Sequence, residues 1–278
     1  MEVPQLIFVF IFGTIIGSFL NVVILRYNTG ANFGGRSRCF SCGKEIRWYD
    51  LVPVLSFVFL RGTCRFCKSK LSFQYPAVEF LTGALFLATF LKYGSEGALS
   101  AMVLDMAVIA VLIVIGVYDL RHKIIPDSLV FLFSILALGR IISMTSISSL
   151  LHFSQNFDLV AGPILAMPIF ILWLVSKGRW IGLGDAKLAL GIGWFLGLSL
   201  GLSSMVIGFW IGAIVGLGLI AFSKFARIPA GRKVLLSIGI KRFGMKSEIP
   251  LAPFLIAGLL IVYFFGTDVI GLNMLFAF

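Results

Sequence analysis

The chain has 278 residues, of which 59% are hydrophobic and only 13% are charged, and its mean hydropathy is +1.05. This composition excludes an ordinary soluble enzyme and is typical of a protein with several transmembrane helices. The formal net charge of +11 resides mostly in the loops between these helices, so no nucleic acid partner is needed to explain it.

Apolar segments long enough to cross a bilayer occur along the whole chain. A transmembrane helix needs about 20 apolar residues for a hydrocarbon core of roughly 30 Å. We therefore predict an all-α polytopic membrane protein with about eight transmembrane helices. The segments lie near residues 5–25, 73–91, 98–118, 125–142, 158–176, 182–199, 202–222 and 250–272.

The positions of Lys and Arg predict the orientation. Four alternate loops, 26–72, 119–124, 177–187 and 223–248, hold nine, two, three and seven of the 23 basic residues. The positive-inside rule places these loops in the cytoplasm and both termini outside it. Basic cytoplasmic loops are then expected to contact the anionic lipids of the bilayer.

The first helix, residues 1–25, reads as a retained anchor rather than a cleaved signal peptide. A signal peptide begins with basic residues, whereas this segment begins with the acidic Glu2 and has no Lys or Arg before it. Arg26 follows the segment directly. We expect a cytosolic tetracysteine loop at 26–72 and a transmembrane core at 73–278.

All four cysteines lie in that loop, as two Cys-x-x-Cys pairs separated by 21 residues. This spacing predicts a structural zinc ion with four thiolate ligands and no open coordination position. Disulfides are the alternative, but they rarely persist in a reducing cytoplasm. The candidate ligands are Cys39, Cys42, Cys64 and Cys67.

Two aspartates lie where apolar segments meet the predicted cytosolic face. Asp119 directly follows the apolar segment 98–118, as part of Tyr118-Asp119. Asp185 lies 66 residues later in Gly182-Leu183-Gly184-Asp185. Each is open to a simple alternative, an interfacial ion pair with a neighbouring Lys or Arg. Asp127 is a rival partner that spacing alone does not rank below Asp119. For Asp105, deeper in a helix, a structural hydrogen bond is expected.

If two carboxylates converge, like-charge repulsion keeps one protonated while the other ionises. One can then activate water while the other polarises a peptide carbonyl, as in aspartic proteases. Hydrolysis by water is the simplest chemistry for such a site.

Several segments together resemble type IV prepilin leader peptidases, which are membrane aspartic proteases of the Gly-x-Gly-Asp type. The resemblance covers nearly the whole chain. One departure is Ala252, which stands where this family commonly has a glycine. The segments are Gly17–Arg26, the two cysteine pairs, Tyr49–Ser56, Tyr75–Glu79, Asp119–Asp127, Gly182–Leu188 and Ile249–Leu255.

The resemblance implies that Asp119 and Asp185 are the catalytic pair. It implies type IV prepilins or pseudopilins as substrates, whose short basic leader is removed at the cytosolic face of the bacterial inner membrane during pilus assembly or protein secretion. It also implies a second activity, N-methylation of the new N-terminal residue with S-adenosylmethionine. The sequence has no Rossmann fingerprint, and none of its residues is assigned to methyl transfer. Glu79 is named only as a candidate contributor to the methylation site.

Other functions remain open from the sequence. A monofunctional prepilin peptidase would lack the methyl transfer. In an ion-coupled transporter the acids would bind cations, although no internal repeat is visible. A zinc-loop membrane scaffold would need the cysteines but not the aspartates. Presenilin-like proteases share the aspartate motifs and lack the cysteine loop.

Overall fold

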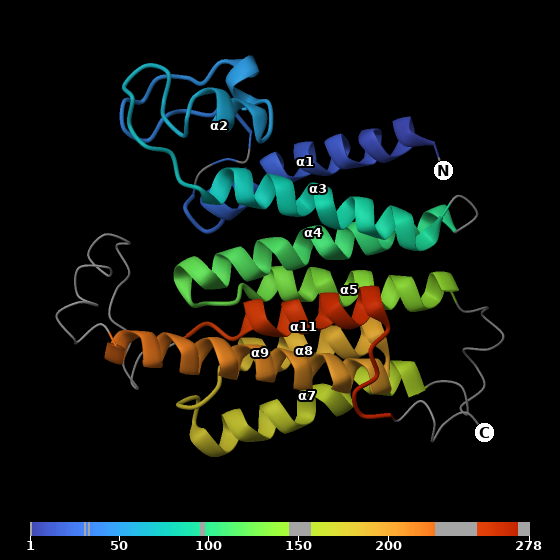
Figure 1. The fold of residues 1–278 in the computed structure, drawn as a ribbon. Helices are drawn as coiled ribbons and strands as arrows, with labels where there is room; N and C mark the ends of the chain where they lie inside the picture. Colours follow the sequence, from blue (N-terminus) through green and yellow to red (C-terminus); the bar gives the residue numbers. More distant parts are fainter. Residues whose placement is uncertain are drawn as a thin grey trace. The chain divides into compact units, whose positions relative to one another are not determined.

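The computed structural model describes residues 2–30, 32, 34–94, 98–144, 157–225 and 249–271 (Figure 1). Its regular structure is helical apart from two isolated β-bridges, so the predicted all-α class is confirmed for the described residues. The helices are α1 (Val3–Arg26), η1 (Trp48–Leu51), α2 (Leu55–Phe59), α3 (Gln74–Tyr93), α4 (Leu99–His122), α5 (Asp127–Met144), α7 (Phe157–Ser176), α8 (Leu183–Leu196), α9 (Leu198–Phe225) and α11 (Ala252–Phe265).

Four of these helices are long and apolar enough to cross a membrane: α1, α4, most of α7 and most of α9. Helices α8 and α11 have only 14 residues each. At 1.5 Å per residue each rises about 21 Å, less than a hydrocarbon core of roughly 30 Å. The number of eight crossings therefore stays a prediction.

The predicted segments 182–199 and 250–272 are longer than the helices found there. Helix α8 ends at Gly197 (φ 76°) and α11 ends at Gly266 (φ 62°), two positive φ values that glycine adopts without steric cost. These glycines stop the helices although the apolar run continues beyond them. The basic loop 223–248 lies almost entirely outside the described residues.

The chain divides into two compact units, one of residues 1–118 with 131–152 and the other of residues 119–130 with 153–278. The division passes through α4 just before Asp119 and through α5 after Val130. Each unit has its own core.

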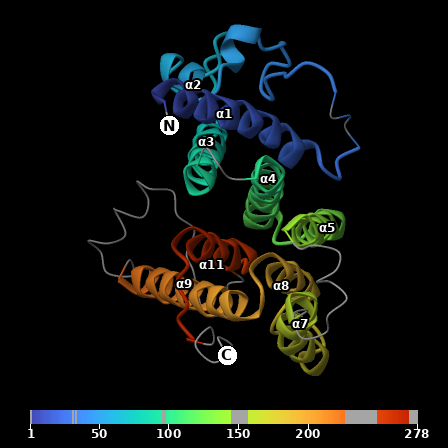
Figure 2. The same cartoon turned by 90° about the vertical axis from the view of Figure 1, so that its right-hand side faces the viewer.

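In the first unit, α1 packs closely on α3 through glycines (Figure 2). A Cβ atom added at Gly13 would lie 2.8 Å from the Cα of Gly83. Small residues let membrane helices approach in this way. The buried Asp105 carboxylate of α4 accepts a hydrogen bond from Tyr93, at the end of α3, at 2.6 Å. It also forms an ion pair with Arg140 of α5 at 2.6 Å, and these contacts confirm its predicted structural role.

In the second unit, close packing at glycines also joins α9 to α11 and α7 to α8. A Cβ atom at Gly258 would collide with the Ser204 carbonyl oxygen, and one at Gly193 would lie 2.6 Å from the Ala161 carbonyl oxygen. These glycines let α11 pack closely on α9 and α8 on α7.

Candidate active site and metal centre

Asp119 lies in the last turn of α4, within the second unit. The helix ends directly after it, where Lys123 adopts a positive φ of 55° and its N–H donates to the Asp119 carbonyl oxygen at 2.8 Å. The carboxyl group is nevertheless buried, with 4% of the residue exposed. Its Oδ2 atom has no hydrogen-bond partner, and the backbone N–H of Ala252, at the start of α11, interacts with the carboxylate.

Asp185 lies in the first turn of α8 and is also buried. Its Oδ2 accepts a hydrogen bond from the backbone N–H of Gly182 at 3.2 Å, which caps the helix. The N-terminus of a helix carries partial positive charge and favours a carboxylate there.

The structure places the two predicted residues in the same unit, near enough for the charge of Asp119 to act on the Asp185 carboxyl group. The pair sits where the end of α4 meets the beginnings of α8 and α11. Among the described residues, no basic side chain lies within ion-pair distance of either carboxylate. The simple alternative of interfacial ion pairs therefore does not describe this arrangement.

Asp127, in contrast, forms the kind of interfacial ion pair that was the alternative for Asp119 and Asp185. Its carboxylate pairs with the Lys187 ammonium at 2.7 Å, and 71% of its side chain is exposed. Burial thus separates Asp119 from Asp127, which spacing in the sequence did not.

Gly184 allows α8 to approach the segment that follows α4. A Cβ atom at Gly184 would lie 2.9 Å from the Cβ of Ile125. The glycine before Asp185 is therefore required for close packing beside the carboxylate pair.

The four cysteines of the first unit converge as predicted. Their Sγ atoms all lie within 4.8 Å of one another, and the Sγ atoms of Cys39 and Cys67 are 3.8 Å apart. A tetrahedral zinc site with bonds of about 2.3 Å has sulfur-to-sulfur edges of about 3.8 Å. None of the four is in a disulfide, and the cluster can therefore hold a metal ion.

The two knuckles share one backbone design. The N–H of Gly43 donates to the Cys39 carbonyl at 2.8 Å, and the N–H of Lys68 donates to the Cys64 carbonyl at 3.0 Å. Both donors have positive φ values, 69° and 58°. Backbone hydrogen bonds from Cys42 and Ser41 lower the pKa of the Cys39 thiol to about 6, which favours the thiolate that a metal binds.

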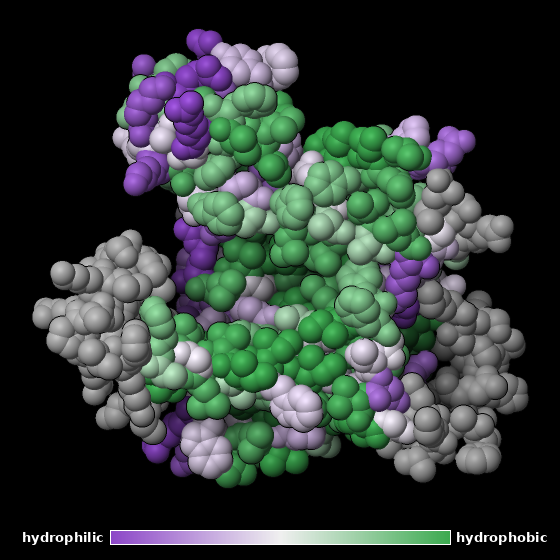
Figure 3. Space-filling view, viewed as in Figure 1, coloured by the Kyte–Doolittle hydropathy of each residue, from purple (hydrophilic) through white to green (hydrophobic). Residues whose placement is uncertain are grey.

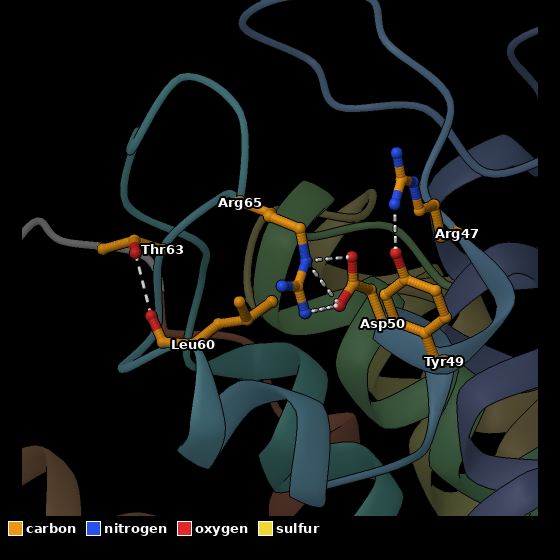
Figure 4. A network of polar contacts seen from close by, with 6 residues as sticks. All are labelled: Arg47, Tyr49, Asp50, Leu60, Thr63 and Arg65. Atoms are coloured by element: carbon orange, nitrogen blue, oxygen red, sulfur yellow. Dashed lines mark hydrogen bonds and ion pairs between the residues drawn. The ribbon is translucent and has the colours of Figure 1, made fainter.

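A polar network ties the second knuckle to η1 (Figure 4). Arg65 forms a forked ion pair with Asp50 at 2.6 Å, and only 6% of the Asp50 side chain is exposed. The Arg65 guanidinium also lies 5.2 Å from the centre of the Tyr49 ring. This network orients η1 relative to the cysteine cluster.

Glu79, in α3, accepts a hydrogen bond from the loop between α1 and α3. Its Oε2 accepts a hydrogen bond from the backbone N–H of Val54 at 2.7 Å, and Val54 has a positive φ of 60°. The contact fastens the segment before α2 to α3. Neither this contact nor the Ala252 amide at Asp119 was predicted from the sequence, although the segments that contain them were singled out.

Comparison with known proteins adds two family matches. The model of the Bacterial Peptidase A24 N-terminal domain matches residues 11–93, which include the four cysteines. The model of the Type IV leader peptidase family matches residues 106–217, which include Asp119 and Asp185.

Curated relatives align over most of the chain. The Prepilin leader peptidase/N-methyltransferase of Bacillus subtilis (strain 168) is 29% identical over 94% of this chain and 95% of its own length. The protein of the same description from Vibrio cholerae serotype O1 is 30% identical over 88% of this chain and 99% of its own length.

A third relative is the Type 4 prepilin-like proteins leader peptide-processing enzyme of Escherichia coli O78:H11. It is 36% identical over 66% of this chain and 74% of its own length. No solved structure matches the chain significantly. The family models and the relatives together establish that this chain belongs to the type IV leader peptidase family and is a peptidase.

Proposed function

We propose that this chain removes the short basic leader of type IV prepilins or pseudopilins at the cytosolic face of the bacterial inner membrane. The buried carboxylates of Asp119 and Asp185, which have no basic partner among the described residues, carry this proposal. Burying an unpaired carboxylate costs free energy, and such groups concentrate at functional sites.

In the proposed reaction the two carboxylates share one proton, because buried carboxyl groups that repel each other resist ionising together. The ionised member takes a proton from water, and the resulting hydroxide attacks the carbonyl carbon of the scissile peptide bond. The protonated member donates to the carbonyl oxygen, which gives a tetrahedral diol. Transfer of a proton to the amide nitrogen then breaks the C–N bond and releases the leader.

The proposed topology has eight crossings, both termini outside the cytoplasm and the cysteine loop inside. We propose a domain organisation with a first helix at 1–25, a loop at 26–72 and a core at 73–278. Four helices of sufficient length support insertion in the membrane, and the basic loops suit anionic lipids. We assign Cys39, Cys42, Cys64 and Cys67 to one structural zinc ion.

We also propose N-methylation of the new N-terminal residue, because this activity is part of the description of the relatives from Bacillus subtilis and Vibrio cholerae. S-adenosylmethionine supplies an electrophilic methyl group to an amine. The described residues contain helices and isolated bridges rather than the parallel sheet of a Rossmann site, and no donor set for this cofactor is evident in them. We therefore assign it no residues.

The test uses the purified chain in liposomes with a prepilin that carries a basic leader, with and without S-adenosylmethionine. Mass spectrometry should show loss of the leader and, with the cofactor, a gain of one methyl group. Cleavage without methylation would support the monofunctional alternative. No cleavage of several prepilins by folded protein would contradict the proposal and favour a transporter or a scaffold.

Gly184 gives a sharper test of the geometry. We expect Gly184→Val to reduce kcat/KM for cleavage roughly 10²-fold, because a displacement of about 1 Å at a catalytic group has that effect. The added side chain would push α8 away from Ile125 and move Asp185. Gly218→Val in α9 is the matched control, since a Cβ atom there meets nothing within 4 Å. Equal activity of the two variants would contradict this account of the glycine.

A further inference from the structure

The loop between α1 and α3 exposes an unusual number of large apolar side chains. We name six of them the apolar loop face. Trp48 is 81% exposed and Phe59 is 82% exposed, as much as charged residues on a soluble surface. A cluster of this kind marks a surface for a protein or a membrane rather than scattered exposure. The six are Trp48, Leu51, Leu55, Val58, Phe59 and Phe73.

These residues come from three consecutive elements that lie together. Helix η1 contacts α2, and the ring of Phe57 in α2 lies 6.2 Å from the ring of Phe73 at the start of α3. Figure 3 shows apolar side chains on the side of the loop toward α1 and strongly hydrophilic ones on its outer side. The loop is therefore amphipathic as a whole.

The apolar loop face is held at a fixed position within the first unit. The Arg65–Asp50 ion pair fastens η1 to the second cysteine knuckle. The hydrogen bond from Val54 to Glu79 fastens the start of α2 to α3. Since one anchor comes from the cysteine cluster and the other from a transmembrane helix, the face cannot turn inward without breaking one of them.

The charges at its edges fit a lipid headgroup region. Residues 26–72 contain nine Lys or Arg and two acidic residues, a balance of +7. The exposed Arg47 directly precedes Trp48, and the exposed Arg61 follows α2. Tryptophan beside arginine is typical of the interface between hydrocarbon and headgroups, where the long basic side chains reach the phosphates. Helix α1, in the same unit, also exposes Phe12 and Phe19.

We propose that the apolar loop face lies in the cytosolic leaflet, so that the cysteine loop is a membrane-anchored element rather than a freely projecting domain. The immersed side chains sit at the level of the acyl boundary, and the exposed Arg47 and Arg61 at the edges of the face reach the anionic headgroups. The inference rests on the proposed topology, in which this loop is cytosolic. It favours lipid over a protein partner because basic residues border the face and because α1, in the same unit, also exposes large apolar side chains.

The experiment measures quenching of tryptophan fluorescence by brominated lipids in nanodiscs that contain anionic phosphatidylglycerol. The contribution of Trp48 is the wild-type signal minus that of Trp48→Phe. We expect lipids brominated near the headgroup to quench about half or more of it, and lipids brominated near the chain end to quench less, as for other interfacial tryptophans. Two further variants in the Trp48→Phe background place tryptophan at Phe59 and at Phe40.

Phe59→Trp should be quenched like Trp48. Phe40→Trp is the matched control, because Phe40 is 84% exposed on the first knuckle and outside the apolar loop face; it should not be quenched. Equal quenching at positions 40 and 59, or none at 48 and 59, would overturn the proposal. So would shielding of Trp48 from iodide only after a prepilin is added, which would make the face a docking site for substrate.

Leader cleavage and zinc content are measured on the same samples. If the enzyme cleaves the leader but Trp48 is not quenched, only the proposal that the loop lies in the membrane is contradicted. If Trp48 is quenched but no leader is cleaved, only the proposed function is contradicted.

Discussion

Asp119→Asn and Asp185→Asn should each reduce leader cleavage about 10²- to 10⁴-fold, the range expected when a general acid or base is removed. Either variant leaves one carboxyl group, which cannot both take a proton from water and donate one to the carbonyl. The double variant should be little worse than either single one, because residues that act as a unit are not additive. The kinetics of leader release in liposomes provide the measurement.

The loss of activity in Asp119→Asn should not be accompanied by a loss of stability. The buried Asp119 Oδ2 has no hydrogen-bond partner, so an uncharged amide at this position relieves part of the cost of burial. We expect Asp119→Asn to have a melting temperature equal to or above that of the wild type. Asp127→Asn is the matched control, because Asp127 is exposed and paired with Lys187; its cleavage rate should stay within about twofold. A loss of activity in Asp127→Asn as large as in Asp119→Asn would contradict the assignment of the pair.

Cys64→Ser should abolish zinc binding and unfold the loop 26–72. The free energy of zinc binding by a four-ligand structural site, about 10–16 kcal/mol in small peptides, is also free energy of folding. The loop is too short to bury a sufficient core without it. Metal analysis should give one zinc per wild-type chain and less than about a tenth of that in the variant, with faster proteolysis at residues of the loop.

Ser41→Ala is the control for this prediction, because Ser41 is exposed in the first knuckle and lies between two ligands in sequence. It should keep its zinc and its resistance to protease. Full zinc occupancy in Cys64→Ser would contradict a four-cysteine site, and disulfide-linked peptides in freshly purified wild type would favour the alternative of disulfide bonds.

Much of this fold can be predicted from the sequence because the signals are strong and local. Apolar runs of helical length placed the long helices within a few residues. The Cys-x-x-Cys pairs could be expected to meet because each knuckle presents two thiolates at fixed spacing. Asp119 and Asp185 could be singled out as candidates because ionisable groups in apolar membrane helices are often functional, but the family resemblance, and not the residue spacing, ranked Asp119 above Asp127.

The remaining features depend on contacts between distant segments. Gly197 and Gly266 end their helices inside apolar runs, where hydropathy gives no signal. Asp119 and Asp127 look alike in sequence, and only packing buries the first and leaves the second exposed. The Ala252 amide at Asp119 is a backbone group, so no side-chain pattern could reveal it.

The shortness of α8 and α11 has a consequence for the lipid around the second unit. In the proposed topology α8 and α11 both cross the bilayer, and at about 21 Å each is shorter than a hydrocarbon core of roughly 30 Å, so the bilayer beside them would have to become thinner or neighbouring helices would have to shield their ends. Asp185 and Ala252 lie at the first turns of these same helices, facing Asp119. With that topology, bilayer thickness influences the depth of the carboxylate pair, and we expect the rate of leader cleavage to depend on acyl chain length.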